Sequence, residues 1–69
     1  MIITVNGTDQ EVADGVTVAE VVERWHPGAV GQRGMAVAID RRVVPRTQWS
    51  DTTISSGARV EFVAAVQGG

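Results

Sequence analysis

The sequence predicts an α+β fold, a mixed sheet of four to five strands with one helix packed on one face. Short runs rich in Val and Ile alternate with turn residues along the chain, a pattern that is typical of strands. One segment in the first half instead carries apolar residues at helical spacing. The elements therefore follow the order ββαβββ, in a chain of 69 residues that is the size of one small domain.

The chain begins with a predicted β-hairpin. Residues 1–5 are apolar and rich in β-branched side chains, and residues 8–12 are expected to pair back onto them. Asn6-Gly7 lies between the two strands. Both residues tolerate the positive φ angles that a two-residue hairpin turn requires.

A helix is predicted to begin after Thr17. The run Thr17-Val18-Ala19-Glu20 matches a capping box, in which the Thr17 hydroxyl accepts from the Glu20 amide and the Glu20 carboxylate accepts from the Thr17 amide. Pro27-Gly28 is expected to end the helix, and residues 27–34 to form a connector. One apolar face follows the spacing i, i+3, i+4 and i+7, and its members are Val18, Val21, Val22 and Trp25.

A second hairpin is predicted after the connector. Residues 35–39 form a strand that turns at Asp40-Arg41 into a short return strand, residues 42–44. Pro45 stops the return strand because proline has no amide hydrogen to donate to a sheet. We therefore expect that strand to be short or to lie at an edge.

The last part of the chain is predicted to supply core residues and a final strand. Residues 47–56 look irregular, with Trp49 and Ile54 as the expected core contacts. Ser56-Gly57 then turns into a strand that runs over residues 59–66. With one helix on one face, the economical arrangement is a β-grasp, in which the first and last strands lie side by side in the middle of the sheet.

The alternation of residues along the strands assigns them to two faces of this sheet. The helix-covered face is expected to receive Met1, Ile3, Val5, Val37, Ile39, Val60 and Phe62. The opposite face is expected to receive Ile2, Ala36, Ala38, Val63 and Ala65. Because these small or apolar residues stand where an open antiparallel surface is normally polar, we interpret them as a docking patch beside the C-terminal residues.

The composition argues against several functions. The sequence has no cysteine and a single histidine, His26, so an internal thiol nucleophile is absent and a metal site or catalytic triad lacks partners. The net charge is −2 and the arginines are scattered, unlike the basic surface of a nucleic-acid-binding protein. No run approaches the roughly 20 apolar residues of a membrane span, and no signal peptide is recognisable. We expect a cytoplasmic protein that is not an enzyme and that binds neither nucleic acid nor membrane.

The chain ends in Gln67-Gly68-Gly69. Glycine has no Cβ and accepts most backbone conformations, so a Gly-Gly end is a thin and pliable handle for a narrow active-site tunnel. We therefore divide the chain into a β-grasp domain, residues 1–66, and a flexible tail, residues 67–69. The chemical group that the tail delivers is the carboxylate of Gly69.

Three features of the sequence now coincide. They are the predicted β-grasp, the Gln67-Gly68-Gly69 end, and the segment Val44-Pro45-Arg46-Thr47-Gln48-Trp49. Together they resemble the ThiS family, the ubiquitin-like sulfur carrier proteins of thiamin thiazole biosynthesis, over essentially the whole chain. A Gly-Gly end alone is shared with ubiquitin and with the small subunit of molybdopterin synthase, whereas the Val-Pro-Arg-x-x-Trp segment is more particular to ThiS.

The resemblance implies a carried substrate that binds no cofactor itself. A ThiF-like adenylating enzyme would use ATP and magnesium to adenylate the Gly69 carboxylate, and sulfur from a cysteine-desulfurase persulfide would replace AMP. The resulting Gly69 thiocarboxylate would donate sulfur in the thiazole synthase ThiG. The residues expected to contact these partners are Ala36, Ala38, Val63, Ala65, Gln67 and Gly68.

Three alternatives stay open at this point. In the first, the chain is a sulfur carrier for molybdopterin or for another acceptor, which leaves the chemistry unchanged. In the second, it is a ubiquitin-like modifier, which would end in an isopeptide bond on target lysines. In the third, it is an interaction domain with an incidental tail, which would bind its partner equally well after removal of Gly69.

Overall fold

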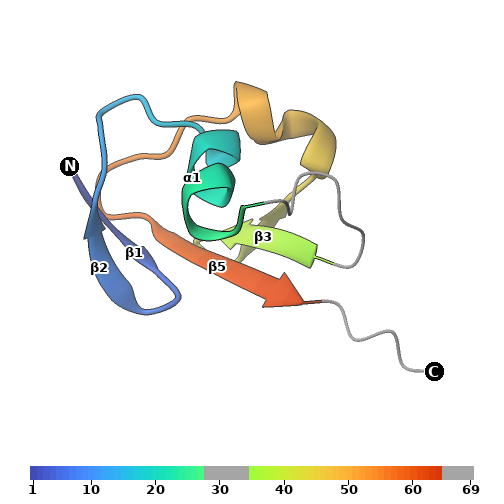
Figure 1. Ribbon diagram of the computed structural model, residues 1–69, viewed down its shortest axis with the longest axis horizontal. Helices are drawn as coiled ribbons and strands as arrows, with labels where there is room; N and C mark the ends of the chain where they lie inside the picture. The colour runs from blue at the N-terminus through green and yellow to red at the C-terminus, as the bar shows by residue number, and fades with distance from the viewer. Residues whose placement is uncertain (28–34, 65–69) are drawn as a thin grey trace.

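The computed structural model describes residues 1–27 and 35–64, and these residues form one sheet with one α-helix over it (Figure 1). The elements in chain order are β1 (Ile2–Val5), β2 (Thr8–Glu11), α1 (Val18–Trp25), β3 (Met35–Ile39), β4 (Arg42–Val44), the 3-10 helix η2 (Arg46–Asp51) and β5 (Arg59–Ala64). The five strands lie in the order β2-β1-β5-β3-β4. The predicted fold class and the order ββαβββ are confirmed.

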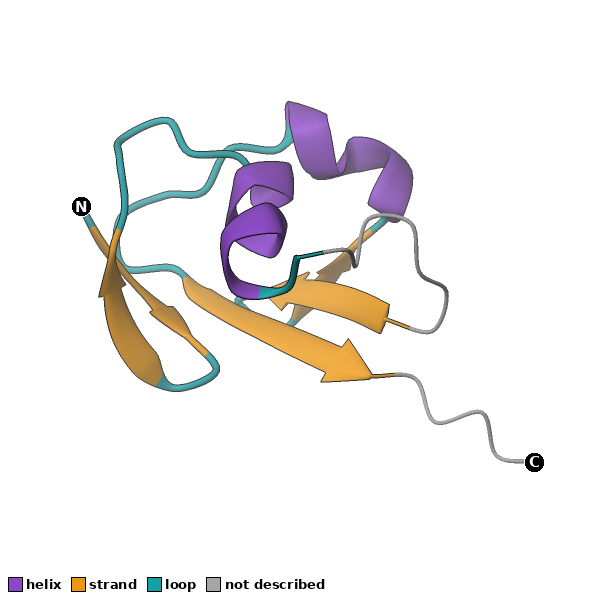
Figure 2. Ribbon diagram, viewed as in Figure 1, coloured by secondary structure: helices purple, strands orange, loops and turns teal. Residues whose placement is uncertain are grey.

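The sheet is mixed because its first and last strands are parallel neighbours. β1 pairs with β5 in parallel, with Thr4 opposite Arg59 and Val5 opposite Val60. The β1–β2, β3–β4 and β3–β5 pairs are antiparallel. Figure 2 shows β5 running through the centre of this sheet, with α1 on one side of it. The predicted placement of the first and last strands side by side is confirmed.

Both hairpins turn over two residues with positive φ. Asn6 and Gly7 have φ values of 50° and 83°, and Asp40 and Arg41 have φ values of 50° and 71°. Such turns match the right-handed twist of the strands that they join, which is why the two-residue spacing was informative. The left-handed conformation is favourable for Asn, Asp and Gly and costs more at Arg41.

Each of the two turns also holds β5 through a side-chain oxygen, one at Arg59 and the other at Phe62. The Asp40 carboxylate Oδ1 accepts from the Arg59 amide at 2.9 Å, and the Asp40 amide donates to the Arg59 carbonyl at 2.9 Å. The Asn6 Oδ1 accepts from the Phe62 amide at 2.9 Å, and the Asn6 amide donates to the Val60 carbonyl at 2.9 Å. The position of β5 is therefore fixed from Arg59 to Phe62.

The helix begins as predicted, with Thr17 as its N-cap. The Glu20 amide donates to the Thr17 Oγ1 at 3.2 Å, and the Thr17 amide donates to the Glu20 Oε1 at 3.0 Å, so both bonds of the capping box are present. The helix ends at Trp25, where the amide of the C-cap residue His26 donates to the Val22 carbonyl at 2.7 Å. Of the predicted apolar face, Val18, Val21 and Val22 are buried, and Trp25 packs against the core while partly exposed.

The core lies between α1 and the covered face of the sheet. Its sheet side is formed by Ile3, Val5, Val37 and Val60, which are buried as predicted, while Met1, Ile39 and Phe62 are partly buried and pack against it. Trp49 and Ile54 close one end of the core, with exposed fractions of 3% and 4%. Both were predicted core contacts.

The segment that carries Trp49 is more regular than predicted. Residues 46–51 form η2 instead of an irregular stretch. Pro45, with φ −57°, precedes the first residue of η2, and the tight helical turn aims Trp49 inward so that its Nε1 donates to the Val44 carbonyl at 2.9 Å. The following residues attach to the start of α1, because the Val18 amide donates to the Thr52 carbonyl and the Ile54 amide to the Val16 carbonyl, each at 2.9 Å.

Candidate functional site

The candidate site is the face of the sheet that α1 leaves open, together with the chain that follows β5. Along β5 the buried Val60 alternates with residues on the open face, namely Arg59, Glu61 and Val63. The ladder places Ala36 opposite Val63 and Ala38 opposite Glu61. The open face is therefore charged at the start of β5 and apolar toward its end.

Four small or apolar residues gather at that end, and we call them the apolar patch: Ala36, Ala38, Val43 and Val63. They come from three neighbouring strands, because Ala36 pairs with Val63 and Ala38 pairs with Val43. Val43 and Val63 are large apolar side chains with exposed fractions of 67% and 51%. An apolar cluster of this kind on an open sheet face is typical of a surface that another protein covers.

Two members of the patch differ from the prediction. Ala38 was expected to be exposed but is only 9% exposed, because its methyl group lies between the longer side chains of Val43 and Glu61 on the adjacent strands. It forms the floor of the patch and not its contact surface. Val43 was not predicted at all, although the two-residue turn at Asp40-Arg41 fixes the register and so places Val43 opposite Ala38.

Ile2 shares the open face but not the patch. It is 49% exposed, and its carbonyl accepts from the Gly57 amide at 2.8 Å, which places it beyond the start of β5. Val63 lies six residues after Gly57, about 20 Å away along a strand. The predicted open face thus divides into two separate apolar sites.

Four of the predicted site residues lie outside the described residues: Ala65, Gln67, Gly68 and Gly69. The structure does define the strand that leads to them. Asn6 fixes the Phe62 amide, and the Phe62 ring meets the His26 ring edge to face, with centroids 5.8 Å apart. The chain toward Gly69 therefore starts from a position that is held on both sides, one residue before Val63 of the patch.

The described residues also limit what else the site contains. Over residues 1–27 and 35–64, no group of three or more His, Cys, Asp or Glu side chains is arranged to hold a metal ion. In the same ranges no helix has the length and apolar character needed to cross a membrane.

The Arg46 guanidinium lies over the Trp49 ring at 5.0 Å, on the outside of the core, and Trp49 is a core residue as expected.

The fold and the strand order define a ubiquitin-like β-grasp protein. The model of the ThiS family matches residues 3–69 of the chain. The chain therefore belongs to the ThiS family. The resemblance drawn from the Gly-Gly end and the Val-Pro-Arg-x-x-Trp segment is confirmed.

Individual relatives agree with this assignment. The sulfur carrier protein ThiS of Escherichia coli strain K12 is 32% identical over 69 residues, which are 100% of both chains. The crystal structure of the thiamine biosynthesis protein ThiS from Geobacter metallireducens matches with a TM-score of 0.82 at 28% identity and covers 100% of both chains. The solution structure of a thiamine biosynthesis protein from the same organism matches with a TM-score of 0.75 at 28% identity, over 100% of this chain and 88% of that one.

Proposed function

We propose that this protein is a sulfur carrier for thiamine biosynthesis, and that the sulfur is carried as a thiocarboxylate at Gly69. The observation that carries the proposal is the match of the ThiS family to residues 3–69, a range that includes Gly68 and Gly69. The full-length similarity to a sulfur carrier protein supports it. The protein is then a co-substrate of other enzymes and not a catalyst.

The chemistry follows from the group that the tail delivers. A carboxylate is a poor electrophile, so an oxygen of Gly69 first attacks the α-phosphorus of ATP in a ThiF-like enzyme, and pyrophosphate leaves. Magnesium on that enzyme neutralises the phosphate charge. A persulfide sulfur then attacks the acyl carbon and AMP leaves, and a thiol reduces the resulting acyl disulfide to the thiocarboxylate. The sequence has no cysteine, so the sulfur is imported, in this proposal from a cysteine desulfurase.

The open face suits the docking that this chemistry requires. Val43 and Val63 present apolar side chains beside the strand that leads to Gly69, so one partner surface covers the patch while Gly68 and Gly69 enter its active site. Ala65 and Gln67, which fall between Val63 and Gly68 in the sequence, are proposed partner contacts. The same surface serves the ThiF-like enzyme and the thiazole synthase ThiG in turn. Because the activation uses ATP, we propose that it takes place in the cytoplasm.

Mass spectrometry of the C-terminal peptide tests the proposal. The protein is incubated with ATP, magnesium, the ThiF-like enzyme of its own source, a persulfide donor and a thiol. We expect the peptide mass to change by the difference between one sulfur and one oxygen atom. Omission of ATP removes the change, and added thiazole synthase with its other substrates consumes the thiocarboxylate.

Two variants serve as controls for the tail. Deletion of Gly69, or addition of one bulky residue after it, abolishes the sulfur uptake. Neither change alters the thermal melt, because the terminal residue of a chain contributes almost nothing to the core. Sulfur uptake by the shortened chain, or a wild-type chain that forms no adenylate with the enzyme, would reject the carrier function in favour of a simple interaction domain.

A further inference from the structure

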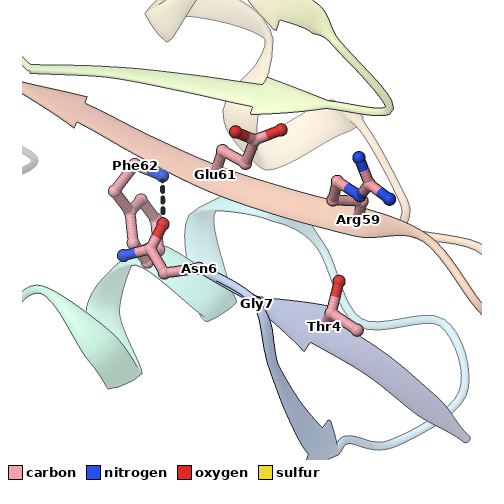
Figure 3. Close-up of a pocket in the computed structure, with 6 residues that line it drawn as sticks. All are labelled: Thr4, Asn6, Gly7, Arg59, Glu61 and Phe62. Carbon is pink, nitrogen blue, oxygen red and sulfur yellow. Dashed lines mark hydrogen bonds between the residues drawn. The ribbon is translucent and has the colours of Figure 1, made fainter.

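Arg59, at the start of β5, lines two hollows on the surface of the protein. A hollow of about 320 Å³ is lined by Asp40, Arg41, Gly57 and Arg59. A second hollow, of about 480 Å³, is lined by Thr4, Asn6, Gly7, Arg59, Glu61 and Phe62 (Figure 3). Arg59 therefore lines both hollows, at the end of β5 that is remote from the apolar patch.

The first hollow carries two guanidinium groups without an acidic partner. Within residues 1–27 and 35–64, neither Arg41 nor Arg59 is within ion-pair distance of a carboxylate, and both side chains are exposed. The one carboxylate at the rim belongs to Asp40, whose Oδ1 is occupied by the Arg59 amide. Gly57 leaves its side of the hollow open, since a Cβ there would meet nothing within 4 Å.

This arrangement fits a single carboxylate. Two arginines and one aspartate give the hollow a net charge of +1. The planar guanidinium group can bind a carboxylate through two parallel hydrogen bonds. The protein as a whole has a net charge of −2, so the local charge of the hollow is opposite in sign to the net charge of the protein.

The position of the hollow indicates where the carboxylate comes from. Arg59 and Val63 share one strand and one face, four residues apart, which is about 13 Å. A protein interface of ordinary size covers about 800 Å² on each partner and extends well beyond that distance. A single partner can therefore cover both the apolar patch and Arg59.

We propose that Arg41 and Arg59 bind an acidic side chain of the adenylating enzyme when that enzyme docks on the open face. This inference rests on the proposed function, because it takes the adenylating enzyme as the partner. The ionic contact lies at the far end of β5 from the tail. It orients the carrier so that the tail points into the active site.

Titration calorimetry with the ThiF-like enzyme of the same source tests the proposed contact of Arg41 and Arg59. Arg59→Gln and Arg41→Gln are each expected to weaken binding about three- to tenfold at low salt. The double variant should lose most of the salt dependence that the wild type shows. All variants keep the wild-type melt, because the bond between Asp40 and β5 uses the Arg59 amide and not its side chain.

Arg42→Gln is the matched control. It removes the same charge from the residue next to Arg41, but Arg42 pairs with Ile39 and so lies on the other face of the sheet. Its affinity for the enzyme should equal that of the wild type. Equal losses for Arg42→Gln and Arg59→Gln would show a general charge effect and reject the site.

Two further outcomes separate this inference from the proposed function. If the Arg41 and Arg59 variants bind the enzyme as the wild type does, the ionic contact is rejected, even where Gly69 still takes up sulfur. If inorganic phosphate alone shifts the Arg41 and Arg59 resonances while enzyme affinity is unaffected, the hollow serves a small anion and the inference is again wrong. Arginine-dependent binding without thiocarboxylate formation would support the contact and reject the sulfur-carrier function.

Discussion

At the scale of single residues, Trp49 shows how a motif residue can be structural. Its ring is 3% exposed, its Nε1 donates to the Val44 carbonyl, and the Arg46 guanidinium covers its outer side. The segment from Val44 to Trp49 thus folds back on itself. The sequence pattern that distinguishes the family reports a way of closing the core, not a catalytic group.

Trp49→Ala is expected to unfold most of the protein. Loss of a buried Trp costs about 3 to 5 kcal/mol, and a core of this size supplies about 3 to 5 kcal/mol in total. Trp49→Phe keeps most of the buried area but loses the hydrogen bond, so its expected cost is nearer 1 kcal/mol. Thermal melts followed by circular dichroism check both variants. A cooperative melt of Trp49→Ala close to that of the wild type would contradict the structural role.

At the scale of elements, β5 depends on side chains as well as on backbone pairing. Its parallel ladder with β1 is short, with Thr4 opposite Arg59 and Val5 opposite Val60. Asn6 extends this contact to Phe62 by supplying an acceptor where β1 has already turned away. The dipeptide Asn6-Gly7 predicted the turn, but the bond from its side chain to a strand more than 50 residues later depends on the tertiary fold.

Asn6→Gly isolates that bond. Glycine accepts the positive φ of residue 6, so the turn is kept and only the acceptor is lost. We expect the free energy of unfolding to fall by about 1 kcal/mol and amide exchange at Phe62 to become faster. Asn6→Asp retains an oxygen acceptor and serves as the control, with exchange at Phe62 close to that of the wild type. Equal protection of Phe62 in all three proteins would show that the bond contributes nothing.

The open sheet face provides a second prediction at this scale. Val63→Asp and Val43→Asp place a charge on exposed positions, so the melts should change little, while affinity for the adenylating enzyme should fall at least tenfold, or about 1.4 kcal/mol. Thr47→Asp is the control, because Thr47 is also exposed but lies on η2, which contacts α1 on the other side of the sheet. Titration against the enzyme decides the matter. The patch would be dismissed if Thr47→Asp weakened binding as much as Val63→Asp.

At the scale of the whole molecule, the element order and the two faces of the sheet could be predicted because local signals agreed with the fold. Two-residue turns, a capping box and period-two alternation each act over a few residues. The burial of Ala38 and the exposure of Val43 depend on neighbours on the adjacent strands. The 3-10 helix η2 forms because Trp49 packs into the core. These features arise only once the chain has closed.

The stability of the domain and its uptake of sulfur are expected to depend on different parts of the chain. The buried core residues of the described chain run from Ile3 to Val60, so a chain of residues 1–66 is expected to melt within a few degrees of the full-length protein. It should be unable to take up sulfur, because it lacks Gly69. Calorimetry and mass spectrometry on the same sample measure both properties. A large loss of stability would show that residues 67–69 belong to the domain.

The parallel pairing of β1 and β5 determines how the molecule responds to force. An enzyme that grips the tail pulls along the axis of β5, while the bonds that hold β5 run across it, from the Thr4 amide to the Ala58 carbonyl, from the Asn6 amide to the Val60 carbonyl and from the Phe62 amide to Asn6. Such a pull loads these bonds together, in shear, whereas a hairpin peeled from its open end breaks them in succession. Under the proposed function, a partner enzyme can therefore pull on the end of the chain without unfolding the domain.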